Sequence, residues 1–147
     1  MLAYLTRGLN QSENNGIAEM TWVATALRSK LALCAGDMEY AQRLTSGMLQ
    51  SLDPEHQPQL YEGVTAFSCW LSLYSNEIGR IRRWLETAPD ETVEFCTLNR
   101  YFYMVKIYCY AALGKHTDAL MLISRMMAYA DYAQRTYIRL ECGLLRA

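Results

Sequence analysis

Three short segments of this chain mark points where one helix would end and another begin, and they recur at nearly equal spacing. Gly36, Asn76 and Gly114 lie 40 and 38 residues apart, and each follows an apolar run with helical periodicity. Glycine readily adopts the left-handed backbone conformation that often ends a helix, and asparagine tolerates it better than most residues do. The chain is therefore predicted to fold as repeated pairs of antiparallel helices.

The residues that follow these three stops repeat as well. Small or apolar residues stand five positions beyond each stop, at Ala41, Ile81 and Ala119. Large apolar residues stand eight positions beyond, at Leu44, Trp84 and Leu122. This spacing places both sets on the buried face of the second helix, and alanine suits the point of closest approach. A period near 40 residues with two helices per unit is typical of an α-solenoid.

We therefore predict an all-α fold: a right-handed superhelix of antiparallel helix pairs, with about three repeats plus flanking helices. The chain shows no sustained alternation of apolar and polar residues, so it gives no strand signal. Its 147 residues suit a single domain that spans 1–147. The expected repeats are approximately 17–52, 54–88 and 90–131, and the expected terminal helices are 2–10 and 135–147.

Helix ends and buried faces can also be predicted inside the repeats. Asp37 is expected to cap the helix that follows Gly36. Asp53 and Pro54 are expected to open the third long helix, although Pro58 allows a later start. The predicted buried stripe of the helix at 17–35 comprises Met20, Val23, Ala24, Leu27, Leu31 and Cys34.

The repeat resembles the tetratricopeptide class of helical repeats. The GxxxxA spacing of that class occurs at Gly36/Ala41 and at Gly114/Ala119, whereas its first-helix series of tryptophan, leucine, glycine and tyrosine is largely absent. The longer period is similar to the degenerate repeats of the large LuxR-type transcriptional regulators of the MalT-like kind. The stretches that carry this second resemblance are RRWLE at 82–86, ALGKHTDAL at 112–120 and QRTYIRLECGLLRA at 134–147.

In the LuxR-type family such repeats stand between a nucleotide-hydrolysing module and a DNA-binding helix-turn-helix. This chain contains no GxxxxGK[ST] phosphate loop and does not close on a basic recognition helix. The resemblance therefore implies an excised sensor segment or a stand-alone relative. The function it implies is a non-catalytic, ligand- or partner-sensing repeat domain of a transcriptional regulator. The alternative is a generic TPR-like protein–protein interaction scaffold or homodimer that is not linked to transcription.

The residue types that catalysis needs do not form a converging set, so we predict that the chain is not an enzyme. His56 and His116 are 60 residues apart, with no carboxylate at metal-ligand spacing from either. The five cysteines form no CxxC pair and are expected to be buried free thiols, at Cys34, Cys69, Cys96, Cys109 and Cys142. No metal and no cofactor are expected.

The net charge and the hydropathy of the chain limit which partners and which cellular compartment we expect. The net charge is -1, and no basic patch is visible, so direct nucleic-acid binding by this segment is not expected. The most apolar run, 64–74, is about half of the ~20 residues that span a bilayer. The first residues lack the pattern of a secretion leader. We expect a cytoplasmic protein that does not enter a membrane.

The first helices of successive units line the concave face of an α-solenoid, so groove positions can be named from the alignment. Six residues before each stop lie Lys30, Trp70 and Tyr108, and seven residues further back lie Val23, Gly63 and Tyr101. A tyrosine ring offers a flat apolar body and a polar tip, which suit sugar-like, peptide or aromatic ligands. The predicted groove for a protein or small-molecule effector therefore comprises Lys30, Trp70, Tyr101 and Tyr108. The alternative is that these rings fill the core between helices, as expected for Tyr103 and Tyr110.

Overall fold

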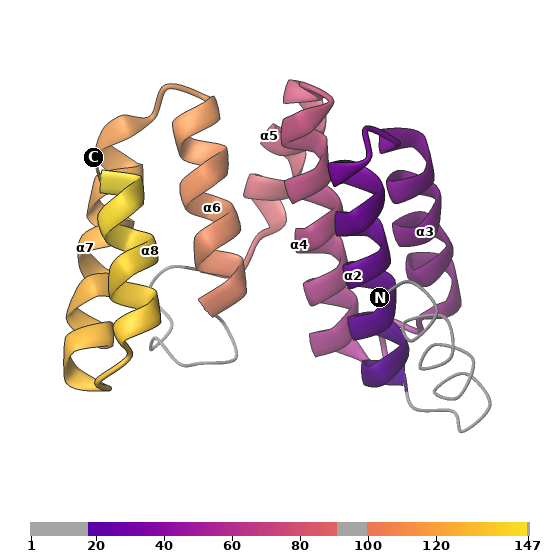
Figure 1. Cartoon of the computed structure of the whole chain (residues 1–147), viewed down its shortest axis with the longest axis horizontal. Helices are drawn as coiled ribbons and strands as arrows, with labels where there is room; N and C mark the ends of the chain where they lie inside the picture. Colours follow the sequence, from indigo (N-terminus) through magenta and orange to yellow (C-terminus); the bar gives the residue numbers. More distant parts are fainter. Residues whose placement is uncertain (1–17, 91–99, 147) are drawn as a thin grey trace. The chain divides into compact units, whose positions relative to one another are not determined.

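The computed structural model describes residues 18–90 and 100–146, and the described residues are helical with no strand (Figure 1). The helices are α2 (Ala18–Cys34), α3 (Met38–Ser51), α4 (Pro58–Tyr74), α5 (Ile78–Thr87), α6 (Arg100–Ala112), α7 (His116–Tyr132) and α8 (Thr136–Arg146). The all-α prediction is confirmed, whereas the superhelical arrangement of repeats stays a prediction. The helix expected at 2–10 lies outside the described residues.

Four helix–helix turns in the described part of the chain share one backbone geometry. Each contains a residue with positive φ: Gly36 (81°), Asn76 (56°), Gly114 (71°) and Gln134 (52°). The amide of the following residue donates to the carbonyl oxygen five positions earlier, as from Asp37 to Ala32 at 2.9 Å and from Glu77 to Ser72 at 3.0 Å. Such bonds define the Schellman motif that ends helices. The three predicted stops are confirmed, and Gln134, which lies between the predicted repeat 90–131 and the predicted terminal helix 135–147, adds a fourth.

The helices that follow the three predicted stops bury the expected positions. The residues five beyond the stops are all buried, namely Ala41, Ile81 and Ala119. Of the residues eight beyond, Trp84 and Leu122 are buried and Leu44 is half-buried. Asp37 caps α3 as predicted, because its side chain accepts a hydrogen bond from the Tyr40 amide at 2.9 Å.

The chain divides into two compact units, 1–71 and 72–147, and the boundary falls inside α4. In the first unit α2 and α3 lie side by side, joined by the turn at Gly36 (Figure 1). Its buried cluster joins Met48 and Leu52 at the end of α3 to Val64 of α4, with Trp22 of α2 packed against it. The predicted single domain over 1–147 is not tested by this division and stays a prediction.

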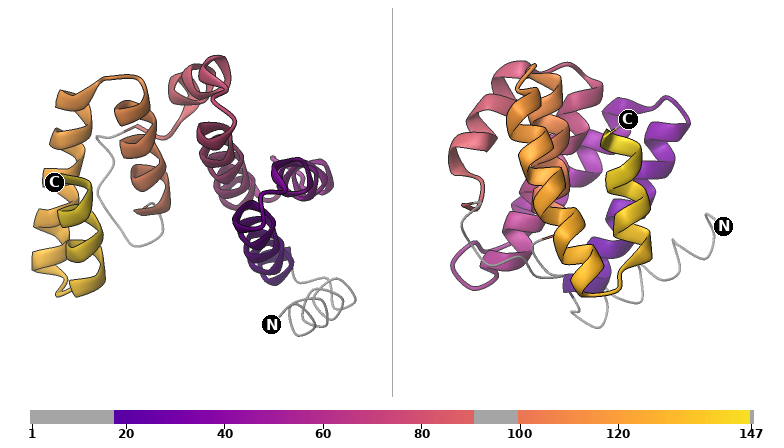
Figure 2. Two further views of the ribbon diagram at one scale, coloured as in Figure 1. Left: turned by 45° about the horizontal axis from the view of Figure 1, so that its top comes forward. Right: turned by 90° about the vertical axis from the view of Figure 1, so that its left-hand side faces the viewer.

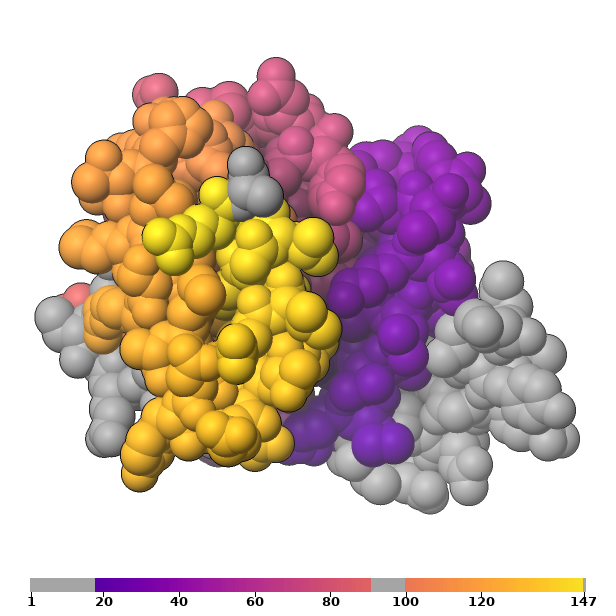
Figure 3. Space-filling model, turned by 60° about the vertical axis from the view of Figure 1, so that its left-hand side comes forward, coloured from indigo at the N-terminus to yellow at the C-terminus, as the bar shows by residue number. Residues whose placement is uncertain are grey.

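In the second unit α7 packs against both α6 and α8, and α8 runs beside α7 in Figures 1 and 2. The shared core includes Ile107 of α6, Leu122, Ile123 and Met126 of α7, and Cys142 of α8. Tyr103 is buried in this core and Tyr110 packs against it. Figure 3 shows α8, in yellow, at the surface of this unit.

The buried face of α2 differs from the prediction. Met20, Val23 and Leu27 are 56%, 50% and 44% exposed, and Cys34 is exposed as well. The buried residues of α2 are small: Ala24, as predicted, together with Thr25, Ser29 and Ala32. Ser29 Oγ lies 3.4 Å from Thr45 Oγ1 of α3, with both hydroxyls buried. Small side chains allow two helices to approach closely, so the α2–α3 contact uses them rather than the longer apolar ones.

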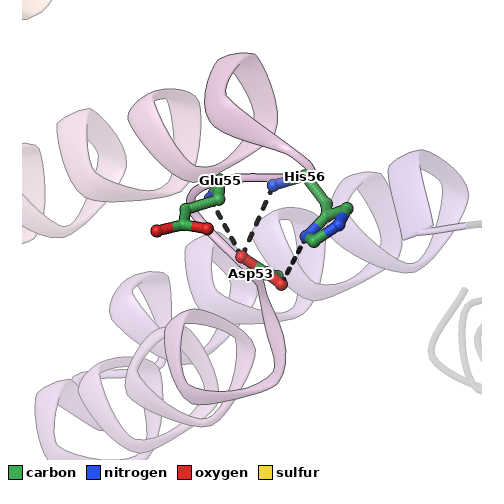
Figure 4. A network of polar contacts seen from close by, with 3 residues as sticks. All are labelled: Asp53, Glu55 and His56. Atoms are coloured by element: carbon green, nitrogen blue, oxygen red, sulfur yellow. Dashed lines mark hydrogen bonds and ion pairs between the residues drawn. The ribbon is translucent and has the colours of Figure 1, made fainter.

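The α4 helix begins at Pro58, the later start that this proline allowed, rather than at Asp53 and Pro54. Asp53 instead organises a separate polar turn before the helix (Figure 4). Its Oδ1 accepts hydrogen bonds from the amides of Glu55 at 2.9 Å and His56 at 3.4 Å, and its Oδ2 lies 2.7 Å from His56 Nδ1. Asparagine and aspartate commonly hold turns in this way.

Three of the five cysteines follow the prediction of buried free thiols, namely Cys69, Cys109 and Cys142. Cys34, at the end of α2, is exposed, so the prediction is wrong for this residue. Cys96 lies outside the described residues.

Candidate functional site

The predicted groove residues are accessible to solvent in each unit. Lys30 is exposed, and Trp70, Tyr101 and Tyr108 are half-buried. Their direct neighbours Ser29, Cys69 and Ile107 are buried, so the accessible positions form a separate face of the first helices. Accessibility is necessary for a groove but does not demonstrate one, and the site stays a prediction.

In the first unit the structure brings Lys30 of α2 and Trp70 of α4 together. The Lys30 ammonium lies 5.7 Å from the centroid of the Trp70 ring, within the range of a cation–π interaction. Trp70 also stacks on Phe67, with centroids 5.4 Å apart and planes at 27°. Trp22 meets the same Phe67 edge-on at 5.1 Å. The indole of Trp70 is therefore fixed by an aromatic array beneath a positive charge.

The Lys30 side chain of this pair is exposed, and α4 leaves space beside Gly63. No carboxylate among the described residues forms an ion pair with Lys30. A Cβ atom placed on Gly63, seven residues before Trp70 on α4, would meet nothing within 4 Å. An unneutralised ammonium beside a half-buried indole can bind a group that carries a negative charge next to a flat or apolar part.

In the second unit Tyr101 and Tyr108 lie seven residues apart on α6, which places them on one face of that helix. Tyr108 packs against the core cluster of α6, α7 and α8. Burial raises the pKa of the Tyr108 phenol, and the charge of Glu141 raises it further. The phenol therefore stays protonated at neutral pH and can both donate and accept a hydrogen bond.

The sequence pattern missed three residues that meet near this face, namely Arg100 of α6 and Tyr137 and Glu141 of α8. Arg100 Nη2 donates to the Tyr137 hydroxyl and to Glu141 Oε2, the latter at 3.0 Å. The guanidinium carbon lies 4.3 Å from the Tyr137 ring centroid. No sequence signal could have found this cluster, because Arg100 stands at least 37 residues from its partners and outside the aligned positions.

Histidines and other metal-ligating side chains are scattered in the described residues. No three histidine, cysteine, aspartate or glutamate side chains gather there in a way that could hold a metal ion. His56, in the turn before α4, and His116, the first residue of α7, are both exposed. Within 18–90 and 100–146, no helix is sufficiently long and apolar to cross a membrane.

Comparisons with known proteins add no identification: no protein-family model, no curated protein and no solved structure matches this chain. The resemblance to tetratricopeptide repeats and to LuxR-type regulators therefore rests on the residues that carry it.

Proposed function

We propose that the chain is a non-catalytic binding module of TPR-like helical repeats, which recognises a protein or small-molecule effector through its first helices. The observation that carries this proposal is the contact of Lys30 with Trp70. The repeat alignment assigned both residues to the groove, and they meet in space although they lie 40 positions apart. A half-buried indole under an unneutralised ammonium is more useful for recognition than for packing.

The burial pattern supports the repeat itself. Counting back from each stop, the positions eleven, seven and four residues earlier face inward on α2, α4 and α6. Seven of these nine residues are buried and two are half-buried: Thr25, Ser29 and Ala32; Thr65, Cys69 and Ser72; Tyr103, Ile107 and Tyr110. Repeats that share one packing geometry should bury the same positions of each first helix, and these three helices do so.

We further propose that this module is the sensing segment of a LuxR-type transcriptional regulator, which is the setting that the RRWLE stretch in α5 supports. Trp84 of that stretch is buried, as a residue that packs a second helix against a first helix should be. The complete reading frame tests the setting directly. We expect it to encode a phosphate loop before these repeats and a helix-turn-helix after them, and a frame with neither contradicts the setting.

The binding function is tested with two variants, Trp70→Ala and Tyr108→Ala. The wild-type chain is titrated with oligosaccharides, aromatic carboxylic acids and a peptide array, and binding is followed by intrinsic tryptophan fluorescence and confirmed by calorimetry. We expect each bound probe to lose at least about tenfold in affinity in one or both variants, a loss typical of removing a central aromatic contact. Tyr132→Ala is the matched control, because Tyr132 of α7 is 90% exposed and outside the predicted groove.

Two results would count against the proposal. Loss of helical circular dichroism in Trp70→Ala would show that this ring is a structural part of the core. Unchanged affinity in both variants would show that binding takes place elsewhere on the chain.

A second candidate function, a protein-interaction scaffold or homodimer, is favoured by one observation. Tyr137, Leu140 and Leu144 of α8 are 60%, 65% and 80% exposed and follow the spacing of a single helical stripe. Contiguous apolar surface of this kind is typical of interaction sites.

A further inference from the structure

Arg100 uses only part of its hydrogen-bonding capacity. Both side-chain hydrogen bonds of Arg100 are donated by Nη2, one to Tyr137 and one to Glu141. Nε is buried and has no hydrogen-bond partner. Arginine offers five N–H donors in a planar fork that matches the two oxygens of a carboxylate or phosphate. Glu141 contacts this fork through one nitrogen, so the Nε side of the guanidinium remains unused.

The two side chains that contact Arg100 are both partly exposed to solvent. The Tyr137 ring covers the guanidinium but is 60% exposed. The side chain of Glu141 is 27% exposed, and among the described residues its ion pair with Arg100 is the only one that joins α6 to α8. An ion pair that remains partly solvated has a small net stability, so a ligand can compete with it.

The surroundings suit a ligand that has an anionic group and an apolar part. Tyr108 packs against the core that α6 shares with α7 and α8, and the charge of Glu141 adds to burial in raising the pKa of its phenol. Beyond Tyr137 the exposed side chains of Leu140 and Leu144 continue along α8. A cation, two phenols and an apolar stripe therefore meet at the α6 and α8 side of this unit.

We propose that Arg100 is an anion-binding residue, whose guanidinium donates hydrogen bonds to the carboxylate or phosphate group of a ligand between α6 and α8. In the protein without ligand, Glu141 holds the place of that group. This site lies within the second unit and does not depend on Lys30 and Trp70, so it can be present even if the binding function proposed above is wrong.

The test follows the Arg100 Nε–H resonance of the ¹⁵N-labelled full chain by NMR, together with backbone amides of α8. Sodium phosphate and sodium acetate are titrated separately at constant ionic strength. We expect a saturable shift with at least one of them, and at least about threefold tighter binding in Glu141→Gln, which removes the competing charge while keeping a similar shape. Saturation by phosphate alone or by acetate alone would identify the anion class, and either result supports the site.

Two further variants separate recognition from structure. Arg100→Lys keeps the positive charge but lacks the fork, so we expect the α8 amides to lose their saturable response. Arg139→Gln is the control, because Arg139 also lies on α8 and is 62% exposed in its ion pair with Asp131. The proposal is overturned if neither anion gives saturation in Glu141→Gln, or if Arg100→Lys responds like the wild type. Such a result would leave Arg100 as a structural link between α6 and α8.

Discussion

At the scale of single residues, the clearest feature is the left-handed residue that separates consecutive helices. Two of the four such positions are glycines, and two carry side chains, at Asn76 and Gln134. The left-handed conformation costs a residue with a Cβ roughly 1–2 kcal/mol, while glycine loses about 0.5–1 kcal/mol more chain entropy on folding. Glycine should therefore be favoured at every one of these turns.

The first prediction compares Gln134→Gly with Gly114→Ala. We expect Gln134→Gly to stabilise the protein by about 0.5–1 kcal/mol, and Gly114→Ala to destabilise it by about 1 kcal/mol. Gly114 has open space around a Cβ atom, so the cost in Gly114→Ala comes from its φ of +71° rather than from a clash. Urea unfolding followed by circular dichroism measures both changes. Effects of the same sign would contradict the assignment of these turns.

The second prediction concerns pH and the turn at Asp53. The Glu55 amide and the His56 side chain lower the pKa of Asp53 below its ordinary value of 3.8. The carboxylate therefore stabilises the folded state above pH 3.8, and this contribution is lost as the pH falls through the lower folded pKa. We expect Asp53→Asn to be less stable than wild type at pH 7, with the difference shrinking below pH 3.8. Thermal unfolding at several pH values measures it, and a difference independent of pH would refute this reading.

At the scale of elements, α2 shows why a buried face cannot be read from apolar residues alone. Met20, Val23 and Leu27 share a helical spacing, and so do the small residues Ala24 and Ala32 with Ser29 between them. Both stripes fit one amphipathic helix. The choice between them depends on how closely α3 approaches, which is a property of the pair of helices rather than of α2.

The third prediction tests this choice with two substitutions on α2. Ser29→Leu places a larger side chain between α2 and α3, and we expect it to destabilise the protein by about 1–3 kcal/mol. Leu27→Ser removes an apolar side chain that is 44% exposed, and we expect a change within about 0.5 kcal/mol. Chemical denaturation monitored by circular dichroism compares them. If Leu27→Ser destabilises the protein more than Ser29→Leu does, the buried stripe predicted from the sequence is correct.

At the scale of the whole molecule, the exposed stripe on α8 distinguishes a monomer from an associating chain. The fourth prediction is that the molar mass measured by multi-angle light scattering rises with concentration, because Leu140 and Leu144 become buried in a contact between copies. Leu140→Glu/Leu144→Glu should remain a monomer, since burying two carboxylates is unfavourable. The matched control Arg82→Glu/Arg83→Glu changes two exposed residues of α5 and should associate like the wild type. A strict monomer at every concentration would argue against the homodimer.

The sequence by itself determined that the described chain is helical and where three of its helices end. Local physics decides these features: Gly36 and Gly114 can adopt a left-handed φ that few residues tolerate, and the Asp37 side chain accepts from an amide three residues away. The five-residue offset from stop to buried position is local too, because helical geometry fixes it once the turn is set. The approximate alignment also named Lys30 and Trp70, which then proved to be in contact.

Only the tertiary structure decided which face of α2 is buried, and which residues meet across helices that are distant in the chain. Ser29 and Thr45 pack because α2 and α3 approach closely, and no count of apolar residues reveals that distance. Arg100 meets Glu141 because α7 holds α6 and α8 around one core, so the contact spans 41 residues and leaves no periodic signal. Contacts within a few residues follow from helical geometry, whereas these depend on how whole helices pack.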